Sequence, residues 1–246
     1  MVSVSDSRQR PAFAALAFAM VFPAAMTWFY FVALGHQGGV PGPAQSVAYA
    51  IGKTIQFGFP TLFVALTRPS RFGFPKMTRR GWGAALSFAL ATSSAMAVLY
   101  FAWLKQSPWL GDTPQRVREK VEGFGIGSFP AFIAFALFLS SVHSLLEEYY
   151  WRWFVFRELR DRGTPGLAIA LSSLGFMLHH IVVLGVYFPD RFWTLAMPFS
   201  IGVAFGGAVW AWIYDRSGSL LPSWISHALV DSAIMTIGWD LLSLTL

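Results

Sequence analysis

Apolar residues run along the chain in long blocks, and short polar or Gly/Pro-rich stretches separate these blocks. From Pro11 to Gly52 there is no Asp, Glu, Lys or Arg, and about 20 apolar residues are enough for a helix to cross a bilayer. The pattern therefore predicts an all-α fold, a polytopic membrane helical bundle of about seven transmembrane helices. The expected spans are 12–34, 46–67, 82–104, 129–156, 166–188, 193–214 and 219–242.

The composition strengthens this prediction. Hydrophobic residues make up 55% of the chain, charged residues only 12%, and cysteine is absent, whereas soluble domains carry about 25% charged residues. A soluble globule, a disordered chain and a nucleic-acid-binding module are therefore excluded. The lack of cysteine excludes disulfides, thiolate zinc sites and cysteine nucleophiles. From composition alone the partner we expect is the lipid bilayer, with no nucleic acid.

The charged loops predict the orientation. Basic residues crowd the second and fourth connections, while the first, Gly35 to Pro43, has no charge. Because loops rich in Lys and Arg stay in the cytoplasm, the N-terminus and the even-numbered loops should be cytoplasmic. We expect an integral, multi-pass protein of a bacterial plasma membrane. The basic residues of the second and fourth connections are Arg68, Arg71, Lys76, Arg79, Arg80, Arg157, Arg160 and Arg162.

Two polar segments depart from the simple pattern. The third connection carries four basic residues on the expected outer side, together with three acidic ones. Within it, residues 113–123 predict a short interfacial helix with Thr113 or Asp112 as its cap. Lys53, near the outer end of the second span, should extend its amine toward the membrane surface.

The fourth span contains His143, Glu147, Glu148 and Arg152 among Phe, Leu, Tyr and Trp. A charge at mid-bilayer costs about 2.5–3.5 kcal/mol on insertion scales, so such residues need a reason to be there. Glu148 and Arg152 are four residues apart and can pair on one helix face. Glu147 points about 100° away and lacks that partner. His143 either bonds to Glu147 or simply lines the bundle, and we favour the second interpretation.

Other ionisable residues lie on the fifth and seventh spans. Phe176 and His180 are spaced four apart, as are His227 and Asp231, so each pair shares a helix face. Measured from the Arg-rich membrane edge, Glu147, His180 and His227 each lie about 15 Å deep. Adjacent His179 and His180 point about 100° apart, so only one is expected to face a given site. For His179 we favour a packing or interfacial role.

These residues suit water activation in a pocket that restricts water, with Glu147 as the base. No Gly-x-Ser-x-Gly or His-Glu-x-x-His motif is present, so serine and zinc-helix hydrolases lack support. A proton relay in a transporter uses similar residues. We disfavour a transporter because the chain shows no repeat symmetry.

Three motifs resemble one known family. Residues 147–152 (EEYYWR) resemble its E-E-x-x-x-R motif, residues 176–180 (FMLHH) its F-x-x-x-H, and residues 227–231 (HALVD) its H-x-x-x-[DN]. The family is CPBP (Abi), intramembrane proteases that include the type II CAAX prenyl endopeptidases and bacteriocin-processing proteins. The resemblance covers 129–242, a four-helix protease core. Residues 1–128 would then be variable N-terminal transmembrane helices with the interfacial segment, integrated into one membrane domain.

The resemblance implies a role for each motif residue. Glu147 and His180 would activate the attacking water, and His227 with Asp231 would stabilise the oxyanion. A carboxylate cannot donate a hydrogen bond unless it is protonated, so we expect Asp231 chiefly to orient His227. Glu148 and Arg152 would form a structural ion pair, with Phe176 supporting the second motif.

Metal dependence stays open at this level. Glu147, His180 and His227 would be the three protein ligands of a zinc ion, if one is bound. We favour no metal and no other cofactor, because a glutamate base suffices to activate water.

The expected activity is that of an intramembrane endopeptidase. We favour the glutamic type, and a metalloprotease is the second possible type. Its substrate would be a membrane-anchored or membrane-proximal protein or peptide. The alternative is a non-proteolytic membrane scaffold or regulator of a partner protein, although every motif residue is present.

Overall fold

The computed structural model describes residues 4–34, 42–72 and 78–244. This part of the chain is helical and contains no strand, so the predicted all-α class is confirmed. Most of the predicted first loop and Lys76 lie outside the described residues. The helices are α1 (Val4–Trp28), η1 (Phe29–Ala33), α2 (Pro43–Thr67), η2 (Pro69–Arg71), α3 (Trp82–Ala102), η3 (Leu104–Gln106), α4 (Thr113–Gly123), α5 (Phe129–Leu137), η4 (Phe138–His143), α6 (Ser144–Glu148), η5 (Tyr149–Phe156), α7 (Arg157–Arg160), α8 (Pro165–Tyr187), η6 (Pro189–Arg191), η7 (Phe192–Ala196), α9 (Met197–Ser217) and α10 (Leu220–Ser243).

Six helical segments of the described chain are long and apolar enough to cross a membrane. A further helix, α2, has 25 residues and corresponds to the remaining predicted span, but it carries more polar residues. The fourth span runs on to Arg160 instead of ending at residue 156, because η5 and α7 continue the same helix. The six segments are Phe13–Ala33, Trp82–Gln106, Phe129–Arg160, Pro165–Tyr187, Pro189–Ser217 and Leu220–Ser243.

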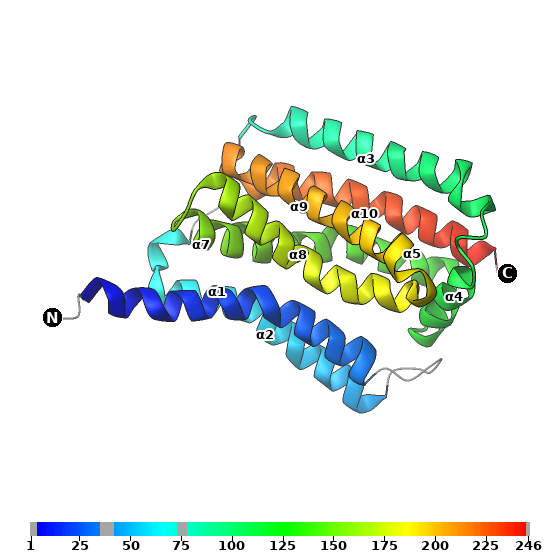
Figure 1. The fold of residues 1–246 in the computed structure, drawn as a ribbon, viewed down its shortest axis with the longest axis horizontal. Helices are drawn as coiled ribbons and strands as arrows, with labels where there is room; N and C mark the ends of the chain where they lie inside the picture. The colour runs from blue at the N-terminus through cyan, green and yellow to red at the C-terminus, as the bar shows by residue number, and fades with distance from the viewer. Residues whose placement is uncertain (1–3, 35–41, 73–77, 245–246) are drawn as a thin grey trace.

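The long helices lie side by side in one bundle (Figure 1). Helix α8 packs against α9 and α1, and α10 packs against α3 and α9. In Figure 1, α1 and α2 form one side of the bundle and α3 the other, with α8, α9 and α10 between them. The short helix α4 lies at one end and contacts α10 and α8. The last helices of the chain thus occupy the interior.

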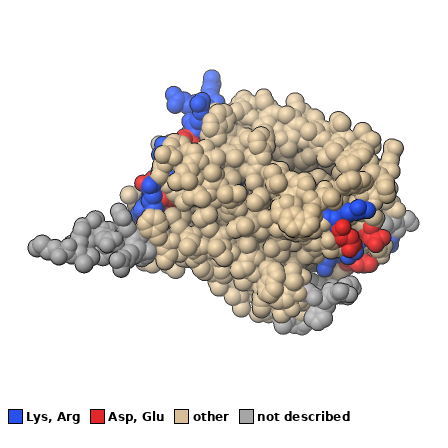
Figure 2. Space-filling view, viewed as in Figure 1, with Lys and Arg blue, Asp and Glu red and all other residues tan. Residues whose placement is uncertain are grey.

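The outer surface has the distribution that a bilayer requires. Figure 2 shows charged side chains gathered at the two ends of the molecule, with a broad uncharged band between them. Large apolar side chains are openly exposed within the spans, including Leu90 at 71% and Trp193 at 75%. Contiguous apolar surface on this scale is not stable in water. The protein is therefore an integral, multi-pass membrane protein.

At the Arg-rich end, the buried carboxylate of Glu158 forms ion pairs with three arginines. Arg68, Arg71 and Arg162 approach its carboxylate at 3.1, 2.5 and 2.7 Å, and Arg71 also pairs with Asp161. Burial lowers the pKa of the Arg71 guanidinium, an effect that the Glu158 carboxylate opposes. This cluster joins the segment after α2 to α7 and closes one end of the bundle.

Basic residues at the opposite end are largely neutralised by ion pairs. Lys105 Nζ lies 2.8 Å from Asp240 Oδ2, and Arg116 Nη2 lies 3.0 Å from Asp190 Oδ2. These pairs explain physically how the third connection tolerates basic residues on its expected outer side. Helix α4 spans the predicted 113–123, with Asp112 at the N-cap position but without a side-chain capping bond.

Lys53 has polar and aromatic neighbours on its own helix. It follows the first residue of α2, Pro43, by ten positions, which corresponds to about 15 Å of helix. Its Nζ donates to Gln56 Oε1 at 3.3 Å and lies 5.4 Å from the centre of the Phe57 ring. A neighbouring amide and aromatic rings, not the membrane surface alone, therefore satisfy this ammonium.

Candidate active site

Three helices of the interior bring the polar motif residues together. Glu147 and Glu148 end α6, a single α-helical turn between the π-helical segments η4 and η5. Such π-turns occur often at functional sites, because they alter the direction of nearby side chains. Helix α8 contributes the two adjacent histidines, and α10 contributes His227 and Asp231. The exposed fractions of Glu147, Glu148 and His227 are 5%, 0% and 3%.

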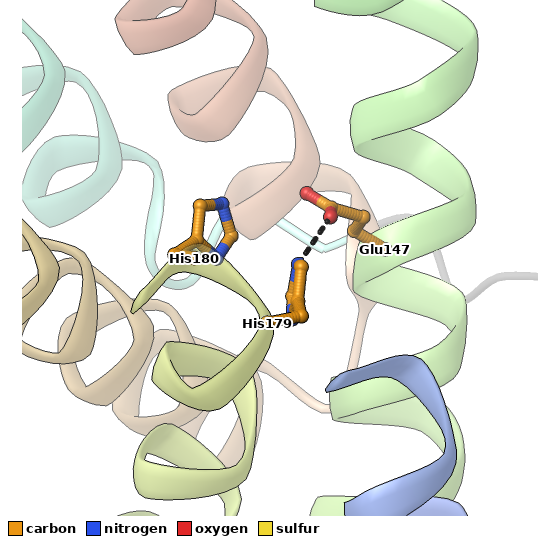
Figure 3. Close-up of side chains that lie close together, drawn as sticks. All are labelled: Glu147, His179 and His180. Carbon is orange, nitrogen blue, oxygen red and sulfur yellow. Dashed lines mark hydrogen bonds and ion pairs between the residues drawn. The ribbon is translucent and has the colours of Figure 1, made fainter. Parts of the chain in front are cut away.

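Glu147 is surrounded by imidazoles. Its Oε1 lies 3.3 Å from His179 Nε2 and 3.4 Å from His143 Nε2. Its Oε2 lies 3.6 Å from His227 Nε2. Figure 3 shows His179 and His180 on one helix turn facing the Glu147 carboxylate across the gap between helices. His143 thus contacts Glu147, the interpretation that the sequence analysis did not favour.

Both histidines of α8 reach the site, so the expectation that only one of them can face it is wrong. Single ligand atoms of Glu147, His179 and His180 all lie within 4.8 Å of one another, and the two imidazole centres are 4.1 Å apart. Their Cβ directions differ by about 100°, but the carboxylate lies between these directions and each ring turns inward. His179 therefore belongs to the site.

His180 is held by its own helix. Its Nδ1 lies 3.0 Å from the carbonyl oxygen of Phe176, an acceptor, so Nδ1 carries the proton and donates it. In the neutral ring, Nε2 is then the unprotonated nitrogen. The Phe176 ring lies 4.7 Å from the His180 ring, centre to centre. Phe176 thus fixes both the tautomer and the position of His180.

His227 lies among three carboxylates. Its Nδ1 is 2.9 Å from Glu148 Oε1, while its Nε2 is 3.6 Å from both Glu147 Oε2 and Asp231 Oδ1. Nδ1 therefore donates its hydrogen bond to Glu148, and Glu148 orients the ring in addition to Asp231, the residue expected from the sequence to do so. Trp210 stacks on the imidazole at 4.0 Å between ring centres and holds the ring plane.

Glu148 also faces Arg152. Arg152 Nη1 lies 3.2 Å from Glu148 Oε1, and Arg152 Nη2 donates to the carbonyl oxygen of Gly207 at 3.2 Å. The guanidinium carbon lies 4.7 Å from the centre of the Phe176 ring. Glu148 and Arg152 are 0% and 1% exposed. If one of the two charges were removed, water could not solvate the remaining one.

The close approach of α9 to α8 and η5 depends on a glycine. A Cβ at Gly207 would lie 3.1 Å from Phe176 Cδ1 and 3.4 Å from Arg152 Nη2. Small residues allow membrane helices to approach each other closely. Gly207 thus places its carbonyl within reach of Arg152.

The donor atoms also suit a metal ion. Two imidazoles and a carboxylate are a common zinc ligand set, and the three groups within 4.8 Å are Glu147, His179 and His180. His179 replaces His227 in the set expected from the sequence. The buried Nδ1 of His179 has no hydrogen-bond partner among the described residues. The donor set is therefore compatible with zinc.

Sequence reasoning missed two residues of the site, His179 and Trp210. The adjacency of His179 to a motif histidine was a signal for the first. Trp210 had no sequence signal, because it lies on a helix without ionisable residues near mid-membrane and reaches His227 only through the α9–α10 contact.

The fold and the site define a class: a polytopic helical membrane protein with a largely buried cluster of two glutamates, one aspartate, four histidines and one arginine. Residues 129–233 match the family described as Type II CAAX prenyl endopeptidase Rce1-like. This region contains every motif residue, and the match confirms the resemblance seen in the sequence. The comparison with curated proteins found no match, and neither did the comparison with solved structures.

The match indicates the general activity, an intramembrane endopeptidase of the CAAX type. The match begins with α5 and ends within α10. Helices α1 to α4 lie outside it.

Proposed function

We propose that the protein hydrolyses a peptide bond in a membrane-associated protein or peptide, using water activated by Glu147 and His180 without a resident metal. One observation carries this proposal: imidazole nitrogens of three histidines lie 3.3–3.6 Å from the buried Glu147 carboxylate. Buried polar groups at mid-membrane are costly and mark functional sites. The family match supports the coarser class, an endopeptidase.

In this mechanism Glu147 is the general base. It accepts a proton from a water molecule as the oxygen attacks the scissile carbonyl carbon. The unprotonated Nε2 of His180 accepts a hydrogen bond from the same water and positions it. Collapse of the tetrahedral intermediate breaks the C–N bond, and the proton held by Glu147 passes to the leaving amine. The products are a carboxylic acid and an amine, and Glu147 is restored as the carboxylate.

His227 is the proposed oxyanion donor. Glu148 accepts from its Nδ1 at 2.9 Å, so donation from Nε2 requires the doubly protonated ring. Glu147, Glu148 and Asp231 all lie within 3.6 Å of its nitrogens, a setting that suits a cationic imidazole. Donors fixed in place before the reaction stabilise the oxyanion without reorganising.

If a zinc ion is bound, Glu147, His179 and His180 would hold it. Such an ion supplies Lewis acidity and lowers the pKa of its bound water. We favour the metal-free form, since a carboxylate base with an adjacent neutral imidazole already meets the requirement for water activation.

The substrate proposal follows from the position of the site. The Glu147 carboxylate lies between α6, α8 and α10 in the apolar band of the molecule (Figure 2), which supports a membrane-anchored or membrane-proximal substrate. In a bacterial plasma membrane, with the N-terminus cytoplasmic, a processed peptide, a pheromone or an anchored surface protein fits this position.

The first experiment measures cleavage of a quenched membrane peptide by purified protein. Candidate peptides come from comparing polypeptide termini in membrane and secreted fractions of cells with the native protein and with Glu147→Gln. Glu147→Gln and His180→Ala should abolish turnover while leaving the detergent-solubilised yield near that of the parent. Glu122→Gln, a change at an exposed residue of α4, is the control and should keep full activity. Substantial turnover by either site variant would refute the assigned base.

A second experiment decides the metal question. Activity should survive a zinc chelator, and the purified protein should carry far less than one metal ion per chain. Chelator-sensitive activity restored by zinc would overturn the metal-free form. It would favour a zinc ion bound by Glu147, His179 and His180.

The termini comparison also tests the scaffold alternative. If no polypeptide changes its termini between the native protein and Glu147→Gln, while a partner protein's activity does change, a scaffold replaces the protease.

A further inference from the structure

A cavity distant from the catalytic cluster lies at the Arg-rich end of the bundle. It has a volume of about 480 Å³ and lies between the start of α3 and the end of α9. Figure 2 shows Lys and Arg side chains standing out at this end of the molecule. The lining residues are Arg80, Gly81, Ala84, Trp212, Ile213 and Arg216.

Within the described part of the chain, two arginines of the cavity have no acidic partner. Among the described residues, no carboxylate lies within 4.0 Å of Arg80 or Arg216, while nearby Asp215 is paired with Arg160 at 3.2 Å. By contrast, Arg68, Arg71 and Arg162 at the same end share the carboxylate of Glu158. Two unpaired arginines at one cavity give it a strong preference for an anion.

The other walls are apolar and aromatic. Ala84 and Ile213 line the cavity, and the Arg216 guanidinium carbon lies 5.0 Å from the centre of the Trp212 ring. Tryptophan is enriched at the membrane–water interface, where one end of the ring is apolar and the other meets water. A cavity with a cation beside an apolar wall suits a ligand that is itself amphipathic.

The backbone keeps the cavity shape. Gly81 has φ of +85°, a conformation that glycine adopts without strain. A Cβ there would lie 3.3 Å from both Ile213 Cγ2 and Ser217 Cβ. Gly81 therefore allows the chain before α3 to press against α9, which places Arg80 and Arg216 on one cavity.

We propose that this cavity binds the phosphate headgroup of an anionic membrane lipid, with Arg80 and Arg216 contacting the phosphate and Ala84, Ile213 and Trp212 contacting the glycerol and upper acyl region. Basic pockets between transmembrane helices bind anionic headgroups by the same chemistry. The apolar wall distinguishes a lipid from free phosphate, which would leave it without a contact. The site is independent of the catalytic proposal.

The test uses the purified full chain in a neutral detergent. Phosphatidylglycerol, phosphatidylcholine and inorganic phosphate are titrated separately, and native mass spectrometry measures bound lipid while thermal unfolding measures stabilisation. Phosphatidylglycerol should bind and raise the melting temperature, and the other two should not. Basic residues supply much of the attraction of such a pocket for an anionic headgroup. Arg80→Ala,Arg216→Ala should therefore weaken phosphatidylglycerol binding by about tenfold or more.

Two further variants keep the test decisive if the double variant fails to fold. Arg79→Ala removes an exposed arginine of the same loop that does not line the cavity, and it should bind phosphatidylglycerol like the parent. Ala84→Trp fills the cavity while keeping both arginines, and it should lose binding. Equal binding of phosphatidylglycerol and phosphatidylcholine would overturn the proposal. So would undiminished binding in Ala84→Trp, or stabilisation by inorganic phosphate alone.

Discussion

Glu148 illustrates how one side chain can connect two parts of a site. Its Oε1 lies 3.2 Å from Arg152 Nη1 and 2.9 Å from His227 Nδ1. The sequence spacing indicates only the first contact, because four residues on one helix share a face. The second contact depends on where α10 packs. We therefore propose that Glu148 positions His227 in addition to pairing with Arg152.

At the residue scale, His227→Ala should lower the turnover number by about 10²–10³, because an oxyanion donor acts in the transition state and little in substrate binding. The measurement is kcat and KM for a cleaved membrane peptide, with the detergent-solubilised yield as the control for folding. A variant with parental kcat would contradict the oxyanion role.

At the element scale, the site depends on close contacts between helices. Trp151 is buried and its ring is parallel to that of His179, with an interplanar angle of 5° and centres 6.1 Å apart. A Cβ at Gly175 would lie 2.7 Å from Trp151 Cζ3. Helix α8 can thus approach η5 only with glycine at this position, and the same contact supports the site histidine.

The corresponding prediction concerns Gly175→Ala. The added methyl group would displace the Trp151 ring, and overpacking of this kind costs about 1–3 kcal/mol. The gain in helix propensity, about 1 kcal/mol, offsets only part of this cost. Both the melting temperature and turnover should fall. Gly166→Ala on the same helix meets nothing within 4 Å and is the matched control, which should be neutral or slightly stabilising. Equal melting temperatures for the two variants would refute the packing argument.

The ion pair between α6 and η5 gives a second prediction at this scale. Arg152→Ala leaves the buried Glu148 charge without its cation, which costs about 3–5 kcal/mol. Glu148→Ala,Arg152→Ala removes both charges and should recover much of the melting temperature. Turnover should stay low in the double variant, because His227 loses its acceptor at Nδ1.

Thermal unfolding and peptide cleavage of the three proteins separate the two roles. Full activity in the double variant would show that Glu148 does not position His227. An Arg152→Ala variant as heat-resistant as the parent would show that the pair does not stabilise the fold.

At the scale of the whole molecule, charge separates the two ends of the bundle. At the Arg-rich end, Glu158 of α7 pairs with arginines from the segment after α2 and from the segment after α7. At the other end, Lys105 and Arg116 are neutralised by Asp240 and Asp190. Because orientation follows basic residues near the ends of spans, the Arg-rich end should be cytoplasmic.

The absence of cysteine from the chain makes this orientation simple to test. Ser70→Cys at the Arg-rich end and Ser128→Cys at the other end both replace exposed residues. In intact cells a membrane-impermeant maleimide should label Ser128→Cys, and Ser70→Cys only after permeabilisation. The reverse labelling pattern would invert the proposed topology.

Much of the fold could be predicted from the amino-acid sequence. A bilayer requires each span to satisfy its own backbone hydrogen bonds, so an apolar block of sufficient length must be a helix. The predicted bounds of the third, fifth and seventh spans agree with α3, α8 and α10 to within two residues. Glu147, Glu148, His180 and His227 could be selected as candidates for the same reason, since ionisable residues are costly inside the membrane.

Contacts between different helices were decided only by the tertiary structure. Periodicity along one helix shows which residues share a face, but it does not show how a neighbouring helix rotates or how π-turns redirect side chains. His179 therefore seemed to point away from Glu147, although its Nε2 lies 3.3 Å from that carboxylate. Likewise Glu148 reaches His227 because α10 packs against α6. Arg80 and Arg216 line one cavity because Gly81 lets the chain before α3 approach α9 closely.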